Sequence, residues 1–300
     1  MRRRGVLLVL GGCGMSLAGL GARADGSGPA LASYYDRHMA LSGGVAHGWL
    51  GRGQPLRQRG GVRQVGVSRD AFFGLLDDGR LLRWTDDAQR ADTLMQGVAA
   101  FAAGESGWLA IDAARQLWHG GRQAPKLLGS DVVAACVGDG ADYHIRADGT
   151  LWVKGLAHRG QYGDGRLSAS ADYVRTAADA VEVKAHTGHA IYLCRDGVVL
   201  GTGGNRFGPL SAHGLGDKAD RWGPIFDGAR AIATGSRHSV AIREDDSLWA
   251  WGEGFGIEPR KLRDGVLATA AGDTATLAMA SDGALWQWDG GDPPRRLRWA

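Results

Sequence analysis

Cysteine is scarce in this chain, with 3 among 300 residues. Beyond residue 24 only Cys136 and Cys194 remain. So few cysteines exclude a disulfide framework, and their spacing matches neither a zinc ribbon nor a redox pair. The sequence leaves open whether the two form a single bridge in an oxidising compartment or stay as two buried thiols.

A surplus of charge of one sign is also lacking. The chain carries 35 Lys and Arg against 32 Asp and Glu, a net charge of +3. Residues 1–24 contain four Arg and no acidic residue, so without them 31 basic residues face 32 acidic ones and the net charge is −1. A nucleic-acid binder needs a basic surface that displaces counterions from phosphates. We therefore expect no nucleic-acid partner.

The first 24 residues have the pattern of an export signal. Arginines at 2–4 precede an uncharged apolar stretch at 5–20, and 22–24 read Ala-Arg-Ala, a small-x-small cleavage site. We expect a signal peptide at 1–24, cleavage after Ala24, a short linker at 25–30 and a periplasmic or secreted protein. A membrane anchor would need about 20 apolar residues. Residues 10–13 also resemble a lipobox, so a lipid on Cys13 is the alternative, and the only membrane attachment we expect.

Apolar runs of helical length are missing from the rest of the chain, which instead repeats a short pattern. Each copy has an apolar run, a small-residue turn, a second run, an Asp-Gly-like turn, then Leu, often Trp, and Gly. Glycine, at 50 of 300 residues, exceeds its usual share of about 7% and suits these turns. The Leu position of the turn falls at Leu81, Leu117, Leu151, Val199, Leu248 and Leu285.

The copies predict an all-β fold. Short runs rich in Val, Ile, Leu and Trp around an Asp-Gly turn indicate a β-hairpin, as at 240–251. A run before it (231–234) and a Pro-containing segment after it (259–262) supply two more strands. Stacked units of this kind form a seven-bladed β-propeller of four-stranded antiparallel blades. We expect one such domain at 31–300, with repeats at 31–61, 62–97, 98–131, 132–179, 180–228, 229–265 and 266–300. The first copy is weak, so a ring of six blades plus a partial one stays open.

Two segments carry a family resemblance. Residues 235–242, Gly-Ser-Arg-His-Ser-Val-Ala-Ile, followed by Leu-Trp-Ala-Trp-Gly at 248–252, resemble the repeat of the regulator of chromosome condensation family. The glycine-rich segments 160–165 and 203–210 resemble that family's Gly-x-Asn-x-x-Gly loop. The resemblance implies a seven-bladed propeller and a bacterial, secreted-type member that serves as a protein-binding disc. It carries over no activity and no contact residue.

Strand order predicts which face binds. With four antiparallel strands, the turn between strands one and two and the loop between strands three and four share a face, opposite the Asp-Gly turns. The copies at 132–179 and 180–228 have the longest loops there, and loops on a rigid scaffold commonly bind partners. Arg and aromatic residues anchor protein interfaces; alternatively, the aromatic ones cap the blade edges. The candidate contact residues are Arg159, Tyr162, Arg206, Phe207, Trp222, Arg237 and His238.

Patterns for catalysis and metal binding are weak. His186 and His189 lie on a turn without a third ligand, whereas zinc needs three or four. His238 occupies the position of His189 in the next copy, which indicates a recurrent structural hydrogen bond, and Ser236 is too near it in sequence for a triad. We therefore expect no catalytic residue, cofactor or metal, and a monomer that binds an unidentified protein. Alternatives are a carbohydrate-active lyase or hydrolase with its site at the propeller mouth, and a lipid-anchored structural envelope protein.

Overall fold

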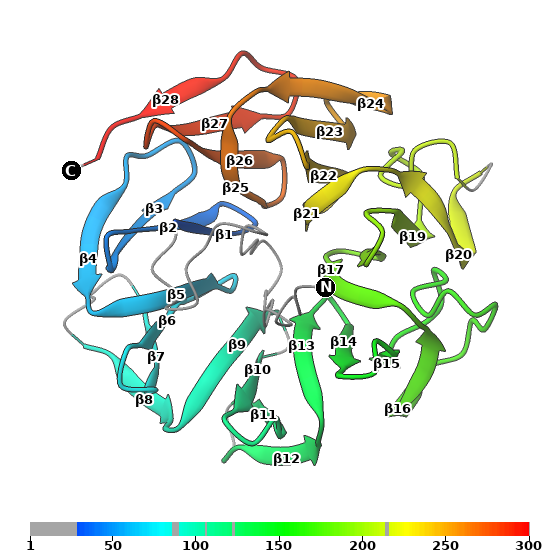
Figure 1. The fold of residues 1–300 in the computed structure, drawn as a ribbon, viewed down its shortest axis with the longest axis horizontal. Coiled ribbons are helices and arrows are strands. Elements are labelled where there is room, and N and C mark those ends of the chain that lie inside the picture. Colours follow the sequence, from blue (N-terminus) through cyan, green and yellow to red (C-terminus); the bar gives the residue numbers. More distant parts are fainter. Residues whose placement is uncertain (1–28, 86–89, 106, 122–123, 214–215, 300) are drawn as a thin grey trace, which may run out of the picture.

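Seven four-stranded antiparallel sheets stand around a common axis in the computed structural model (Figure 1). It describes residues 29–85, 90–105, 107–121, 124–213 and 216–299. The expected signal peptide and Cys13 lie outside the described residues. Within them, no helix has the length and apolarity needed to cross a membrane. The prediction of a seven-bladed, all-β propeller is confirmed.

Each blade consists of four strands that follow one another in the chain. Blade 1 contains β1 (Ala30–Tyr34), β2 (Arg37–Ser42), β3 (Val45–Leu50) and β4 (Leu56–Gly60). Blade 2 contains β5 (Val62–Val67), β6 (Phe72–Leu76), β7 (Leu81–Trp84) and β8 (Asp92–Met95). Blade 3 contains β9 (Val98–Gly104), β10 (Gly107–Asp112), β11 (Leu117–Gly120) and β12 (Lys126–Gly129). Blade 4 contains β13 (Val132–Val137), β14 (Ala141–Arg146), β15 (Leu151–Gly155) and β16 (Ser170–Ala177).

The remaining three blades follow the same order. Blade 5 contains β17 (Ala180–Ala185), β18 (His189–Cys194), β19 (Val199–Gly204) and β20 (Lys218–Phe226). Blade 6 contains β21 (Ala229–Thr234), β22 (His238–Arg243), β23 (Leu248–Gly252) and β24 (Gly256–Arg263). Blade 7 contains β25 (Val266–Ala271), β26 (Ala275–Ala280), β27 (Leu285–Asp289) and β28 (Arg295–Leu297). The weak first copy is thus a complete blade.

The core lies between the blades. Innermost strands such as β21 and β25 are buried along almost their whole length, because each of their faces packs on another blade. The outermost strands β4, β8 and β24 are largely exposed. Two tryptophans two residues apart share one sheet face: Trp249 and Trp251 of blade 6 both contact Phe226 of blade 5. Cys136 and Cys194 are free.

The Asp-Gly turns show why the repeat needs these residues. In blade 4 the Asp148 carboxylate accepts a hydrogen bond from the Thr150 backbone N–H at 2.9 Å, and Gly149 has a φ of +82°. The carbonyl oxygen of Gly149 in turn accepts a bond from the N–H of Ala180, the first residue of blade 5. The hairpin turns of blades 1 to 6 each join two blades in this way.

Candidate functional site

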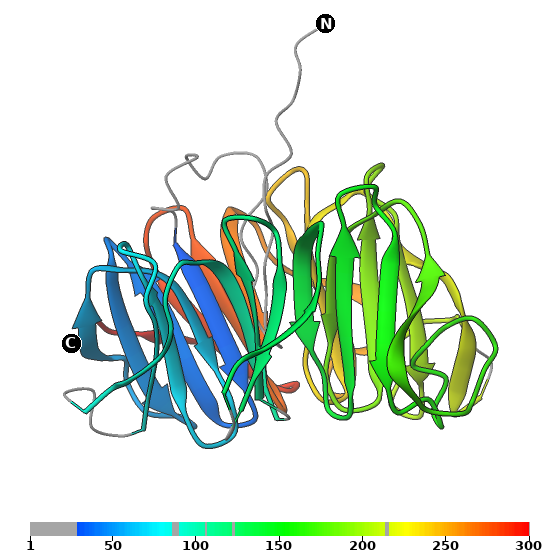
Figure 2. The ribbon, with the colours of Figure 1, turned by 90° about the horizontal axis from the view of Figure 1, so that it is seen from below.

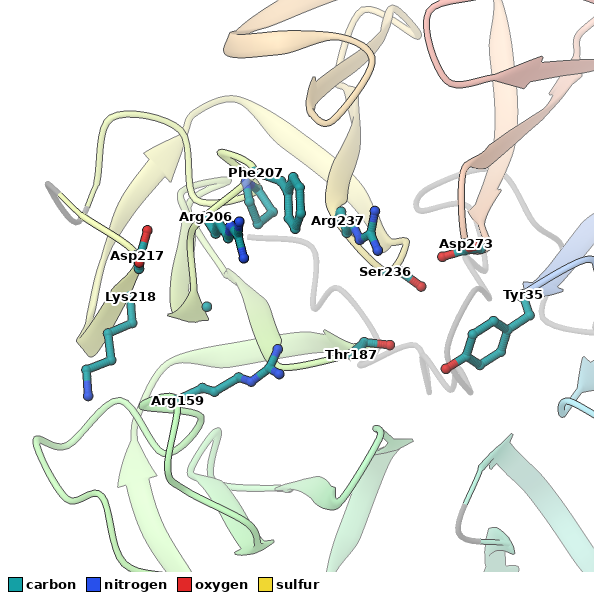
Figure 3. A pocket seen from close by; sticks show the side chains of 12 residues that line it. Tyr35, Arg159, Thr187, Arg206, Phe207, Asp217, Lys218, Ser236, Arg237 and Asp273 are labelled. Carbon is teal, nitrogen blue, oxygen red and sulfur yellow. The ribbon is translucent and has the colours of Figure 1, made fainter.

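Loops from five blades surround a cavity of about 630 Å³ at the centre of one face of the ring (Figure 3). Its residues come from turns between strands one and two, from loops between strands three and four, and from the strand ends beside that loop in blade 5, Gly204 and Lys218. The Asp-Gly turns lie at the other ends of the same strands, which Figure 2 shows running from one face to the other. The structure therefore has the predicted division of the two faces. We call this space the docking cavity.

The two long loops supply much of its wall. They cover residues 156–169 between β15 and β16 and residues 205–217 between β19 and β20. Part of the extra length predicted for these copies is strand instead, since β16 has 8 and β20 has 9 residues. The loops stand in adjacent blades, and both contribute lining residues, Arg159 from the first and Arg206 and Phe207 from the second.

Asn205 organises the loop of blade 5. Its side-chain oxygen accepts a bond from the Leu210 N–H at 3.0 Å, and its amide nitrogen donates to the His213 carbonyl at 3.1 Å. The backbone N–H of Gly208 donates to the Asn205 carbonyl, and Gly208 has a φ of +78°. These bonds fix the segment between them, which places Arg206 and Phe207 on the surface.

The loop of blade 4 is organised by Tyr162, which is fully buried. Its hydroxyl donates to the Gly155 carbonyl at 3.0 Å and accepts from the Ser170 N–H at 3.1 Å, which closes the loop at its base. The Gln161 side chain accepts a bond from the Arg159 N–H at 2.9 Å. The Arg159 side chain lies against Gly188 of blade 5, where an added Cβ would be 2.8 Å from it.

Four of the seven predicted contact residues line the docking cavity. They are Arg159, Arg206, Phe207 and Arg237, which come from blades 4, 5 and 6. The guanidinium carbon of Arg237 lies 4.5 Å from the centre of the Phe207 ring, and that of Arg206 lies 5.8 Å from it. Phe207 is 38% exposed. The sequence was therefore sufficient to identify a cationic and aromatic group that the fold assembles from separate repeats.

The other three residues hold the structure and do not line the cavity. Tyr162 is buried as described. His238 is also buried, and its Nε2 lies 2.9 Å from the Thr276 hydroxyl of blade 7. Trp222 packs edge-on against Tyr192, with ring centres 4.8 Å apart, and covers Gly163. As the alternative interpretation of the loop aromatics expected, Trp222 serves the blade edge.

Several lining residues were missed. Tyr35, Thr187 and Asp273 each lie in a turn between strands one and two, at the position of Ser236 and Arg237 in blade 6. Strand order placed these turns on the binding face, so the signal was present. The side chains at this position differ from copy to copy, however, so they form no sequence pattern. The distance between residues of non-consecutive blades is set only when the ring closes.

The histidines near the cavity are buried and make hydrogen bonds between blades. His189 Nε2 lies 3.2 Å from the Ser239 hydroxyl of blade 6, just as His238 reaches blade 7. The recurrent bond predicted for this repeat position exists, but it joins neighbouring blades rather than closing a turn. Burial lowers the pKa of His189 to about 3 and that of His238 to about 4. Both imidazoles are therefore neutral in the folded protein near pH 7.

His186 and Ser236 are the nearest approach to a catalytic pair. The Ser236 hydroxyl lies 3.3 Å from His186 Nδ1, which also accepts the Thr187 N–H at 2.9 Å. The His186 ring stacks on Tyr34 of blade 1, with centres 4.6 Å apart. Among the described residues, His186 Nε2 has no hydrogen-bond partner that would orient the ring as a base. No group of three His, Cys, Asp or Glu able to hold a metal occurs in that part of the chain.

Comparisons with known proteins support the fold. Residues 229–255 match the model of the regulator of chromosome condensation (RCC1) repeat. No curated protein sequence matches the chain. Among solved structures, Prp20p from Saccharomyces cerevisiae aligns with a TM-score of 0.70 and 13% identity, over 89% of this chain and 90% of Prp20p.

A plant ectodomain shares the architecture as well. The CRINKLY WD40 ectodomain of the Arabidopsis thaliana receptor kinase ACR4 aligns with a TM-score of 0.61 and 15% identity, over 93% of this chain and 97% of that one. At such identities the likeness concerns the fold alone. Blade 6 thus matches the regulator of chromosome condensation repeat in sequence, and the chain as a whole is similar in fold to propellers such as Prp20p.

Proposed function

We propose that this chain is an exported, non-catalytic scaffold that binds another protein through the face that bears the docking cavity. The observation that carries the proposal is the exposed Phe207 ring between the guanidinium groups of Arg206 and Arg237, with Arg159 in the same wall. Arg and aromatic side chains in a concave surface are the common anchors of protein interfaces. Fixed loops lower the entropy cost of binding.

The relatives in fold add support without naming a partner. Prp20p is described by its binding to Gsp1p and histones, and a structure of yeast Prp20 with Kap60 aligns with a TM-score of 0.65 and 15% identity, over 78% of this chain and 74% of that one. Propellers of this repeat can thus serve as protein-binding discs. Export rests on the sequence of residues 1–24.

Partner capture by matched variants tests the binding face. The test variant carries Arg159→Ala, Arg206→Ala, Phe207→Ala and Arg237→Ala. The control carries Arg80→Ala, Arg115→Ala, Arg195→Ala and Leu127→Ala, exposed residues outside the docking cavity. Chemical crosslinking in an envelope extract of the source organism should recover one protein with the wild type and the control, and lose it with the test variant. Equal recovery with both variants would contradict the proposed face.

Mass spectrometry of the mature N-terminus tests export. We expect the chain to begin at Asp25 in the periplasmic or secreted fraction. A lipid on Cys13 would instead establish the envelope-anchored alternative, and an intact Met1 in the cytoplasm would contradict export.

A further inference from the structure

Cations outnumber acids in the wall of the docking cavity. Arg159, Arg206 and Lys218 line it, and among the described residues no carboxylate lies within ion-pair distance of these three side chains. Arg237 does have a partner, Glu253, at 3.1 Å. The acids in the wall are Asp217 and Asp273. Figure 3 shows Lys218 extending away from the cavity centre, which leaves Arg159 and Arg206 as the free cations that face it.

An apolar patch adjoins these cations. Phe207 is 38% and Ile257 is 58% exposed, and Ile257 packs on Gly208, the residue after Phe207, where an added Cβ would lie 3.2 Å from the Ile257 side chain. Exposed apolar side chains are common singly. Here, however, the exposed aliphatic chain of blade 6 lies against the loop that carries Phe207, and Phe207 lines the cavity. A ligand that fills this place gains both charge pairing and apolar burial.

The arrangement is fixed before any ligand arrives. Asn205 holds the turn that carries Arg206 and Phe207, and the stem of Arg159 rests on Gly188 of the next blade. A concave wall focuses the field of its charges more than a flat surface does. Guanidinium groups held in place pair with carboxylates in a bidentate geometry.

Together these observations select one ligand chemistry. On the basis of the proposed function, we propose that the docking cavity binds an acidic loop or terminus of the partner protein. Carboxylates of that segment pair with Arg159 and Arg206, while an apolar side chain beside them covers Phe207 and Ile257. A nucleic acid fits less well, because residues 25–300 carry a net charge of −1 and so lack the basic surface that displaces counterions from phosphates.

Fluorescence anisotropy with synthetic peptides tests this chemistry. One probe is a short fluorescein-labelled peptide rich in Glu with a single Phe, and its counterpart has Gln in place of every Glu. We expect the acidic peptide to bind, more weakly as sodium chloride is added, and the Gln peptide to bind at least about tenfold more weakly. Equal affinity for both peptides, or tighter binding of double-stranded DNA or inorganic phosphate, would overturn the proposal.

Variants locate the binding. Arg159→Ala and Arg206→Ala should each lower the affinity for the acidic peptide about three- to tenfold, because each removes one charge-assisted pair. Arg195→Ala, on the opposite face, should leave its affinity unchanged. The double variant Arg159→Glu with Arg206→Glu should no longer bind the Glu-rich peptide and should instead bind a Lys-rich counterpart. Unchanged affinities in these variants would show that the peptide binds elsewhere, which overturns the inference.

The two proposals can fail separately. If crosslinking of the natural partner depends on Arg159 and Phe207 but the acidic peptide does not bind, the partner chemistry is wrong and the proposed binding face stands. If neither assay depends on the docking cavity, both proposals are wrong.

Discussion

At the scale of single residues, buried histidines join the blades. His189 and His238 each place Nε2 against a hydroxyl of the following blade. Such a bond offsets the cost of burying a polar ring, and removal of the hydroxyl would leave that ring unpaired. The same burial keeps the imidazoles uncharged, so the contacts between blades depend on pH.

Stability should fall as the pH is lowered from about 6.5 to about 4. An unfolded His binds a proton near pH 6.5, but His189 and His238 in the folded protein bind one only near pH 3 and 4. Between these values the unfolded state holds more protons, so each such His removes up to about 1.4 kcal/mol of stability per pH unit. Urea denaturation at several pH values measures the slope. His238→Gln should make it shallower, and an unchanged slope would show that His238 does not contribute.

At the scale of the structural element, the hairpin turn recurs with the same bonds. Asp78, Asp148 and Asp245 each accept a bond from the N–H two residues on. The next residue has a positive φ in every one of these turns, Gly in two of them and Asp246 in the third. An L-residue is strained there because its Cβ approaches the following carbonyl oxygen. The Asp-Gly pair is thus demanded by the backbone.

Gly149→Ala should therefore destabilise the protein by about 1–2 kcal/mol. An added Cβ meets no atom closer than 3.6 Å, so the cost comes from the φ of +82° and not from a clash. Gly129→Ala is the matched control, since no atom lies within 4 Å of its added Cβ. We expect it to change stability by less than about 0.5 kcal/mol. Thermal and urea unfolding of both variants measures the difference, and equal effects would contradict the backbone explanation.

At the scale of the whole molecule, the ring closes without sharing a strand between its ends. Six junctions, from blade 1/2 to blade 6/7, use a main-chain bond from the first residue of a blade to the preceding hairpin turn. At the junction of blades 7 and 1, a main-chain bond from the Asp273 N–H to the Tyr35 carbonyl is joined by several side-chain bonds. Buried Gln287 donates to the Gly51 carbonyl and accepts from Trp49 and Arg295, and Arg52 pairs with Asp289 at 3.1 Å.

Gln287→Leu should open this junction. The change leaves the Trp49 N–H without its acceptor, a cost of about 1–3 kcal/mol, and removes one of the acceptors of the Arg295 guanidinium. Hydrogen exchange should rise in β1, β25 and β27. Gln64→Leu is the comparison, because Gln64 bonds both backbone groups of Phe101 at the junction of blades 2 and 3. It should raise exchange in β5 and β9 instead. The same exchange pattern in both variants would refute a separate closing junction.

Much of the fold could be predicted because its signals are local. Alternating apolar strands and Asp-Gly turns recur along the chain, and each copy gives the strand order of its own blade. Part of the candidate site could be predicted for the same reason, because strand order assigns Arg159, Arg206, Phe207 and Arg237 to one face. Strand order does not give the direction of a side chain in a loop or turn, so it could not separate Tyr162, Trp222 and His238 from the residues that line the cavity. The burial of these three depends on packing against other strands and blades, which no local pattern encodes.

The sequence by itself determined the repeating unit and the face that bears the long loops, while the structure showed that the weak first copy completes a seventh blade. The repeating unit and the face both follow from the backbone preferences of short segments. Only the tertiary structure decided that Arg159, Phe207 and Arg237 share one wall, that His189 and His238 bond the following blades, and that Gln287 closes the ring. These relations join residues of different repeats. These contacts form because the seven blades pack against one another in a closed ring. The packing of the blades sets the distances between residues of different repeats, and the sequence of a single repeat does not.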